Sequence, residues 1–130
     1  MIALDTNILA RFLLNDDPSQ TKAAVALLSQ KRHYTAPPTV VLELVWVLSV
    51  NGCSREEIAK GLRLLFGLPN FRPQEFEALC YALHWYEQGM DFGDAIHLAL
   101  SAKEDGFVTF DKTLGKLAKS IGSVPEVRVI

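Results

Sequence analysis

Apolar and polar positions along the chain follow two alternating patterns. Short apolar runs predict strands, and longer stretches in which apolar residues recur every three or four positions predict helices. The expected strands cover residues 1–4, 33–36, 71–72, 106–109 and 127–130. The expected helices cover residues 8–13, 19–30, 40–49, 54–66, 73–88, 91–104 and 111–120. Strands that alternate with helices predict an α/β fold with a large helical share, in which helices cover both faces of a parallel sheet.

Three of these elements carry further expectations. Residues 40–49 are apolar nearly all the way round, so we expect this helix to be buried, with Thr39 as its cap. Ser54 is followed three residues later by Glu57, which predicts a capping box at the start of the next helix. The apolar run at the N-terminus predicts a buried first strand.

Size and charge narrow the class of protein. A chain of 130 residues with 49% hydrophobic residues is long enough for one core, so we expect a single domain over residues 1–130. The formal net charge of -2 argues against a protein that holds nucleic acid by cationic charge alone. It is compatible with an enzyme that bridges carboxylates to phosphate through a metal ion.

Membrane insertion, zinc binding and thiol redox chemistry are not expected. The longest apolar run, residues 40–50, is too short to span a bilayer, and the N-terminus has no signal-peptide pattern. We therefore expect a cytoplasmic protein. Cys53 and Cys80 are far apart and lack a matching histidine cluster. Cys80 fits the apolar spacing of its helix and is interpreted as a core residue.

Acidic residues follow two of the predicted strands. Asp5 ends the first strand and opens a helix, and Asp111 repeats this arrangement after the strand at 106–109. In open α/β sheets, ligands bind outside the carboxyl ends of the strands. Taken singly, each aspartate is equally well explained as an ordinary helix N-cap.

Glu43 is the only charged residue between positions 40 and 48. Removing a carboxylate from water costs several kcal/mol unless it is paired or binds a metal. Burial of this helix would therefore require compensation for Glu43. A bound metal ion, an arginine partner or a narrow solvated edge would each provide this compensation.

Asp91 and Asp94 are three residues apart, on one face at the start of a helix. Asp91 is interpreted as the N-cap. Asp94, one turn further, either faces the sheet edge or simply benefits from the helix dipole. His97 is interpreted as a core histidine and is not assigned to a metal. Four acids gathered together would repel one another without a cation, and carboxylate oxygens suit Mg²⁺ or Mn²⁺.

These residues together resemble the PIN domain, and within it the VapC-type ribonuclease toxins of toxin-antitoxin pairs. The resemblance covers essentially the whole chain. It rests on Leu-Asp-Thr-Asn at residues 4–7, on Glu43, on Asp-Phe-Gly-Asp-Ala-Ile-His-Leu-Ala at residues 91–99, and on Val-Thr-Phe-Asp-Lys at residues 108–112. By this resemblance the family's acidic quartet falls on Asp5, Glu43, Asp94 and Asp111. Accessory polar positions beside the metal fall on Thr6, Asn7 and Thr109.

The resemblance also implies a fold, an activity and partners. The implied fold is a three-layer structure in which helices flank a parallel sheet of about five strands. The implied activity is Mg²⁺- or Mn²⁺-dependent endonucleolytic cleavage of RNA, leaving a 5′-phosphate and a 3′-hydroxyl. The implied partners are a separate antitoxin protein and a second copy of the chain.

Lysines form a stripe on the last predicted helix. Lys112, Lys116 and Lys119 follow Asp111 at helical spacing, so they are either RNA contacts or part of a solvated helix face. Three other functions stay open from the residues alone. They are a housekeeping PIN nuclease without a toxin role, a receiver-like phosphoacceptor, and a non-catalytic module that docks another protein.

Overall fold

The structure is a computed structural model that describes all 130 residues. The chain divides into two compact units, an N-terminal unit of Met1–Gln74 and a C-terminal unit of Glu75–Ile130. The expectation of one domain over residues 1–130 stays a prediction.

The N-terminal unit contains two short strands and four helices. In chain order they are β1 (Ile2–Ala3), α1 (Thr6–Leu13), α2 (Pro18–Leu28), β2 (Tyr34–Thr35), α3 (Pro38–Val50) and α4 (Arg55–Phe66). The strands β1 and β2 pair in parallel, with Ile2 opposite Tyr34. Tyr34 also forms a single parallel bridge with Phe71, so the strand expected at residues 71–72 is reduced to one bridge.

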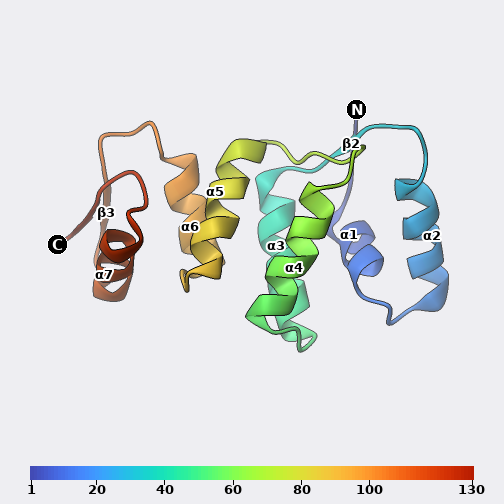
Figure 1. The fold of residues 1–130 in the computed structure, drawn as a ribbon, viewed down its shortest axis with the longest axis horizontal. Helices are drawn as coiled ribbons and strands as arrows, with labels where there is room; N and C mark the ends of the chain where they lie inside the picture. The colour runs from blue at the N-terminus through green and yellow to red at the C-terminus, as the bar shows by residue number, and fades with distance from the viewer. The chain divides into compact units, whose positions relative to one another are not determined.

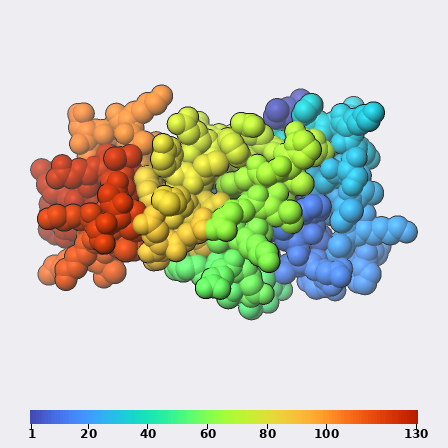
Figure 2. Space-filling view, in the orientation of Figure 1, coloured from blue at the N-terminus to red at the C-terminus, as the bar shows by residue number.

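Leucine side chains form the core of the N-terminal unit. Leu9 of α1, Leu44 of α3 and Leu62 of α4 are completely buried. Helix α3 packs against both α1 and α4 (Figure 1). The predicted capping box is confirmed, because Ser54 and Glu57 exchange side-chain and backbone hydrogen bonds at the start of α4. The space-filling view shows side chains of α4 on the visible surface of this unit (Figure 2).

Three expectations for the N-terminal unit are wrong. Strand β1 is exposed at both Ile2 and Ala3 rather than buried. Helix α3 is buried on one side only, and Trp46 on its other side is 64% exposed. The apolar composition of α3 therefore does not mean that the whole helix is buried, because folded proteins keep much apolar surface exposed to water. Thr39 does not cap α3, which begins after Pro37 without a side-chain cap.

The C-terminal unit contains three helices and two strands. In chain order they are α5 (Phe76–Glu87), α6 (Phe92–Leu100), β3 (Phe107–Thr109), α7 (Lys112–Ile121) and β4 (Val127–Val129). Helices α5 and α6 lie side by side (Figure 1), and the rings of Tyr86 and Phe92 meet edge to face with centroids 5.4 Å apart. Strands β3 and β4 pair in parallel, with α7 as the crossover between them.

Close packing fixes the crossover helix on its sheet. A Cβ built at Gly115 of α7 would overlap the Cγ2 methyl of Val129 on β4. Only a residue without a side chain allows this approach of helix to strand. The position of Asp111, one residue before α7, is therefore set by both the strand before it and the packing after it.

Several boundaries and side-chain positions in the C-terminal unit differ from expectation. Helix α5 begins at Phe76 rather than Pro73, after Glu75 in a left-handed conformation with φ of 56°. Helix α6 ends at Leu100 rather than at residue 104. Cys80 is exposed rather than buried, because the buried side of α5 runs through Leu79, Ala82, Leu83, Trp85 and Tyr86.

Both strand pairs are parallel and joined through helices, which is the connectivity expected of the α/β class. The structure contains four strands in two separate pairs, so a single sheet of about five strands stays a prediction. None of the helices has the length and apolar character needed to cross a membrane.

Candidate functional site

Asp5 lies where β1 ends and α1 begins. Its backbone is extended, and its carboxylate accepts a hydrogen bond of 2.8 Å from the backbone N–H of Thr6. The side chain is exposed to solvent. Asp5 is therefore a helix cap and, at the same time, an accessible carboxylate at the end of a strand.

Thr6 connects Asp5 to Glu43. Its side chain is buried, and its hydroxyl donates a hydrogen bond to the Glu43 carboxylate on α3. The backbone N–H of the same residue is bonded to Asp5. Two carboxylates that are 38 positions apart in sequence are thus held within one residue of each other.

Glu43 is exposed, which contradicts the expectation that the helix buries it. The buried side of α3 consists of Val41, Leu44, Val45 and Leu48, and Glu43 lies outside it. No desolvation cost therefore needs compensation, and the burial argument for a metal at Glu43 fails. Its place in the site depends instead on the Thr6 hydrogen bond.

The C-terminal unit brings three acids into one neighbourhood. Asp91 caps α6 and accepts a hydrogen bond of 3.1 Å from the backbone N–H of Asp94, as predicted. Asp94 is half-buried one turn into the helix. Asp111 caps α7 by accepting from the backbone N–H of Leu114 at 3.0 Å.

Partial burial raises the pKa of Asp94, and the negative charges of Asp91 and Asp111 raise it further. The neighbouring His97 acts in the opposite direction. Ionised Asp94 is thus held in surroundings that disfavour its charge, and a cation bound there would relieve the repulsion. His97 is exposed, so its interpretation as a core residue is wrong.

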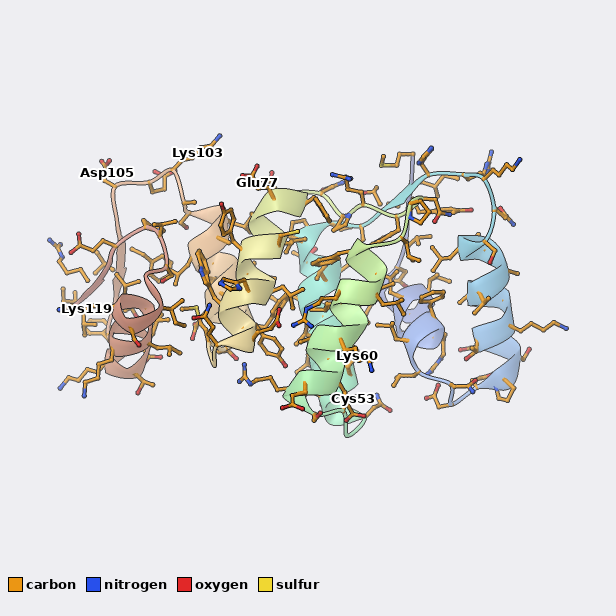
Figure 3. The ribbon with its side chains drawn as sticks, in the orientation of Figure 1. Cys53, Lys60, Glu77, Lys103, Asp105 and Lys119 are labelled. Atoms are coloured by element: carbon orange, nitrogen blue, oxygen red, sulfur yellow. The ribbon has the colours of Figure 1, made fainter.

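The predicted accessory residues and lysines lie close along the chain to predicted acids. Thr109 accepts a hydrogen bond of 3.0 Å at its hydroxyl from the backbone N–H of Asp111. Asn7 is exposed in the first turn of α1. Lys112, Lys116 and Lys119 are all exposed on α7, where Lys119 projects from the helix (Figure 3).

The carboxylate oxygens of the four predicted acids are ligands that suit a divalent cation. The carboxylates of Asp5 and Glu43 in one unit, and of Asp94 and Asp111 in the other, present oxygen ligands, which Mg²⁺ and Mn²⁺ prefer. Partial burial raises the pKa of Asp94 most, and the negative charges of Asp91 and Asp111 raise it further. The structure shows no ready-made group of three or more His, Cys, Asp or Glu side chains that could hold an ion.

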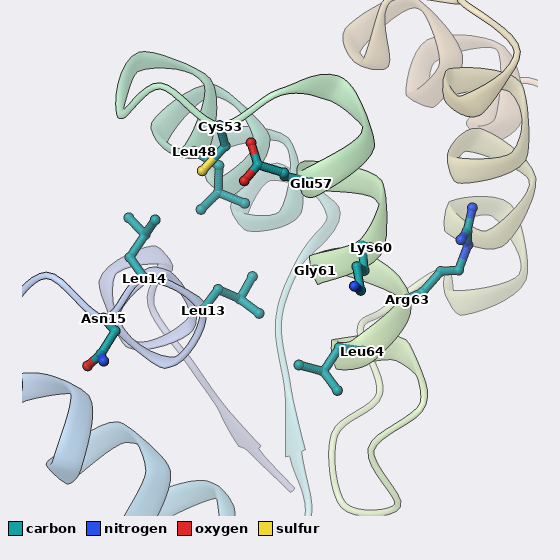
Figure 4. A pocket seen from close by; sticks show the side chains of 10 residues that line it. All are labelled: Leu13, Leu14, Asn15, Leu48, Cys53, Glu57, Lys60, Gly61, Arg63 and Leu64. Atoms are coloured by element: carbon teal, nitrogen blue, oxygen red, sulfur yellow. The ribbon is translucent and has the colours of Figure 1, made fainter.

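A hollow in the N-terminal unit is lined by neither Asp5 nor Glu43. It has a volume of about 730 Å³ and lies between the end of α1, the end of α3 and α4 (Figure 4). Leu13, Leu14 and Leu64 contribute apolar walls, and Cys53 and Lys60 add polar atoms. A second hollow, of about 450 Å³, lies between α1 and α2, and Asn7 lines one side of it.

The bridging role of Thr6 was not predicted from the sequence. The sequence resemblance placed Thr6 among the accessory residues, but no spacing rule connects it to a glutamate in a different helix. The sequence does indicate the electrostatic effect of Asp91 on Asp94, because acids three residues apart share one face of a helix.

Comparison with known proteins identifies the family. A model of the PIN domain family matches residues 2–120. Among solved structures, the chain resembles VapC20 of Mycobacterium tuberculosis, which is described as a sarcin-ricin loop cleaving toxin. The identity is 18%, the TM-score is 0.44, and the match covers 95% of this chain and 97% of that one. No curated protein matches the chain. The family match confirms the predicted α/β class and spans nearly the whole sequence, and this chain therefore belongs to the PIN domain family.

Proposed function

We propose that the protein is a divalent-metal-dependent endoribonuclease and the toxin of a type II toxin-antitoxin pair. Membership of the PIN domain family supports a nuclease. The motifs at residues 4–7, 91–99 and 108–112 resemble those of VapC-type toxins. The observation that carries the proposal is the pair of carboxylates, Asp5 and Glu43, that Thr6 holds together.

We assign Asp5, Glu43, Asp94 and Asp111 as the acidic residues of the active site and as the residues that hold Mg²⁺ or Mn²⁺. When bound, such an ion polarises a phosphate and lowers the pKa of a water molecule. The chain itself fixes the orientation of its acids. Thr6 sets the position of Glu43, and the caps of α1 and α7 set those of Asp5 and Asp111.

The RNA backbone also has to be held close to several acids of the same charge. Lys112, Lys116 and Lys119 provide three exposed cations on the helix that Asp111 caps. Contacts from these lysines to phosphates would offset the repulsion between substrate and acids. Asn7 and Thr109 are assigned as polar groups beside the acids.

The remaining features of the proposal follow from the toxin resemblance. They are an RNA substrate, a separate antitoxin protein, a homodimer and a cytoplasmic location. Family membership favours the nuclease over the receiver-like phosphoacceptor and the non-catalytic docking module. A toxin is distinguished from a housekeeping PIN nuclease by growth arrest when the chain is expressed alone, and by relief of that arrest when its neighbouring gene is expressed with it.

The central test is cleavage of a labelled single-stranded RNA by the purified protein. We expect cleavage in Mg²⁺ or Mn²⁺, none in EDTA, and products with a 5′-phosphate. Asp5→Asn and Asp94→Asn should abolish cleavage while circular dichroism shows an unchanged fold. Asp105→Asn removes an exposed acid outside the proposed set and should cleave like the wild type. Cleavage that persists in EDTA, or in folded Asp94→Asn, would overturn the proposal.

A further inference from the structure

We propose that Phe110 is a base-stacking residue, whose ring binds the face of an unpaired nucleobase of the RNA beside the acidic site. The inference rests on the proposed ribonuclease function and adds to it a residue that contacts the bases of the RNA. Phe110 lies between Thr109 and Asp111, at the end of β3. It is not one of the residues assigned above to metal binding or to phosphate contact.

The ring of Phe110 is 80% exposed, whereas Phe71 and Phe92 are each only 2% exposed. Only Met1, at the chain end, is equally exposed among the large hydrophobic side chains. Removing an aromatic ring from water is favourable, so an exposed ring is available to bind an apolar or aromatic surface.

The backbone on both sides of Phe110 is fixed. Thr109 pairs with Val129 in the parallel ladder, and its carbonyl accepts a hydrogen bond of 3.0 Å from the backbone N–H of Ile130. Asp111 bonds to the Thr109 hydroxyl and caps α7. The ring is therefore presented from a rigid support, so little backbone freedom would be lost when a base stacks on it.

The surroundings of Phe110 favour a base over a phosphate. Asp111 follows directly, and its charge already acts on Asp94. Phosphates are repelled by these acids, but a neutral ring and a neutral base stack without that penalty. The exposed side chain of Lys112, two residues after Phe110, offers a cation for the adjoining phosphate. An aromatic ring beside a cation is the combination by which proteins bind single-stranded nucleic acid.

Stacking also explains why the substrate should be unpaired. The faces of bases in a duplex are covered by their neighbours, so an exposed ring on a protein reaches only bases that are already unstacked. Val108, two residues earlier on the same face of β3, is also exposed and gives a non-aromatic control at a neighbouring position.

The test measures RNA binding rather than cleavage. In an Asp94→Asn background, fluorescence anisotropy of a labelled single-stranded RNA is compared for four versions: the parent, Phe110→Ala, Phe110→Leu and Phe110→Trp. We expect Ala and Leu to weaken binding by about tenfold or more, and Trp to keep or tighten it. Val108→Ala should bind like the parent. A duplex of the same sequence and an abasic oligonucleotide should show no dependence on position 110.

Two kinds of result would overturn the inference. In one, Phe110→Leu binds like the parent, which would show that the aromatic ring is not needed. In the other, the losses persist on the abasic oligonucleotide, or Phe110→Ala changes the oligomeric state in sedimentation, which would make Phe110 a protein contact. Cleavage by the enzyme with an intact Asp94 keeps the two proposals apart. If it cleaves RNA and Phe110→Leu has an unchanged KM, only the stacking role fails, whereas an enzyme that neither binds nor cleaves RNA ends both.

Discussion

The hydroxyl of Thr6 donates a hydrogen bond to the carboxylate of Glu43, and joins the start of α1 to the middle of α3. The hydroxyl is buried and the carboxylate is exposed. The bond therefore holds the Glu43 carboxylate at the start of α1 and leaves it in contact with solvent. Glu43 keeps its solvent access but loses rotational freedom, which is the condition that a ligand-binding carboxylate needs.

Replacing Thr6 tests this anchoring role. Thr6→Val keeps the shape and removes the donor, so Glu43 should become mobile and kcat for RNA cleavage should fall about tenfold or more. Thr6→Ser keeps a hydroxyl and should retain most of the activity. Steady-state kinetics of the two variants provide the measurement. Equal activity of Thr6→Val and wild type would show that the bond does not position Glu43.

The crowded charge at Asp94 predicts a stability effect without metal. Burial and the nearby acids raise the pKa of Asp94, so its ionised form opposes folding near neutral pH. Asp94→Asn should therefore raise the melting temperature of the metal-free protein and remove the further rise that Mn²⁺ gives the wild type. Asp91→Asn preserves a capping side chain and should keep the response to Mn²⁺. A lower metal-free melting temperature for Asp94→Asn would contradict this reading.

The lysines of α7 predict a salt effect on substrate binding. Lys116→Glu should weaken binding of single-stranded RNA and reduce the salt slope of log K by about 0.7 for each lost phosphate contact. Metal affinity should stay unchanged. Lys60→Glu makes the same charge change at an exposed position on α4, outside the proposed site, and serves as the control. Identical salt slopes for Lys116→Glu and wild type would leave the lysine stripe as a solvated surface.

The capping box of α4 predicts a pH dependence of stability. Hydrogen bonds from the backbone and side chain of Ser54 lower the pKa of Glu57. A lowered pKa means that the stabilisation is fully present above the ordinary glutamate value of about 4.3, and is lost as pH falls through the lowered value. Glu57→Ala should thus be less stable than Glu56→Ala in urea at pH 7, and the difference in stability should shrink as pH falls through the lowered pKa of Glu57. A stability difference between the two variants that does not change with pH would show that the charge of Glu57 does not contribute to the capping box.

The sequence predicted those features that depend on neighbours along the chain. Helix starts at Asp91 and Ser54 follow from side-chain oxygens that reach backbone N–H groups three residues ahead, and both caps are confirmed. Parallel pairing between β3 and β4 follows from the helix between them. Each of these depends on local geometry, which a short sequence pattern records well.

Features that depend on contacts across the chain were predicted less well. Glu43 was expected to be buried because its sequence neighbours are apolar, yet it lies on the exposed side of α3. The apolar spacing of its helix predicts that Cys80 is buried with Leu79 and Leu83, yet only the two leucines are buried. Periodicity shows that a helix has an apolar stripe, but not which neighbour covers it. The four assigned acids came from family resemblance and remain a proposal.

Asp5, Asp91 and Asp111 each use a carboxylate oxygen to begin a helix, and two of them are also assigned to catalysis. Alanine scanning at these positions would therefore confuse two effects, since an inactive variant could result from a frayed helix as easily as from a missing ligand. Asparagine keeps the capping oxygen and removes only the charge. In this protein, substitution of aspartate by asparagine therefore distinguishes the loss of a catalytic charge from the loss of a helix cap.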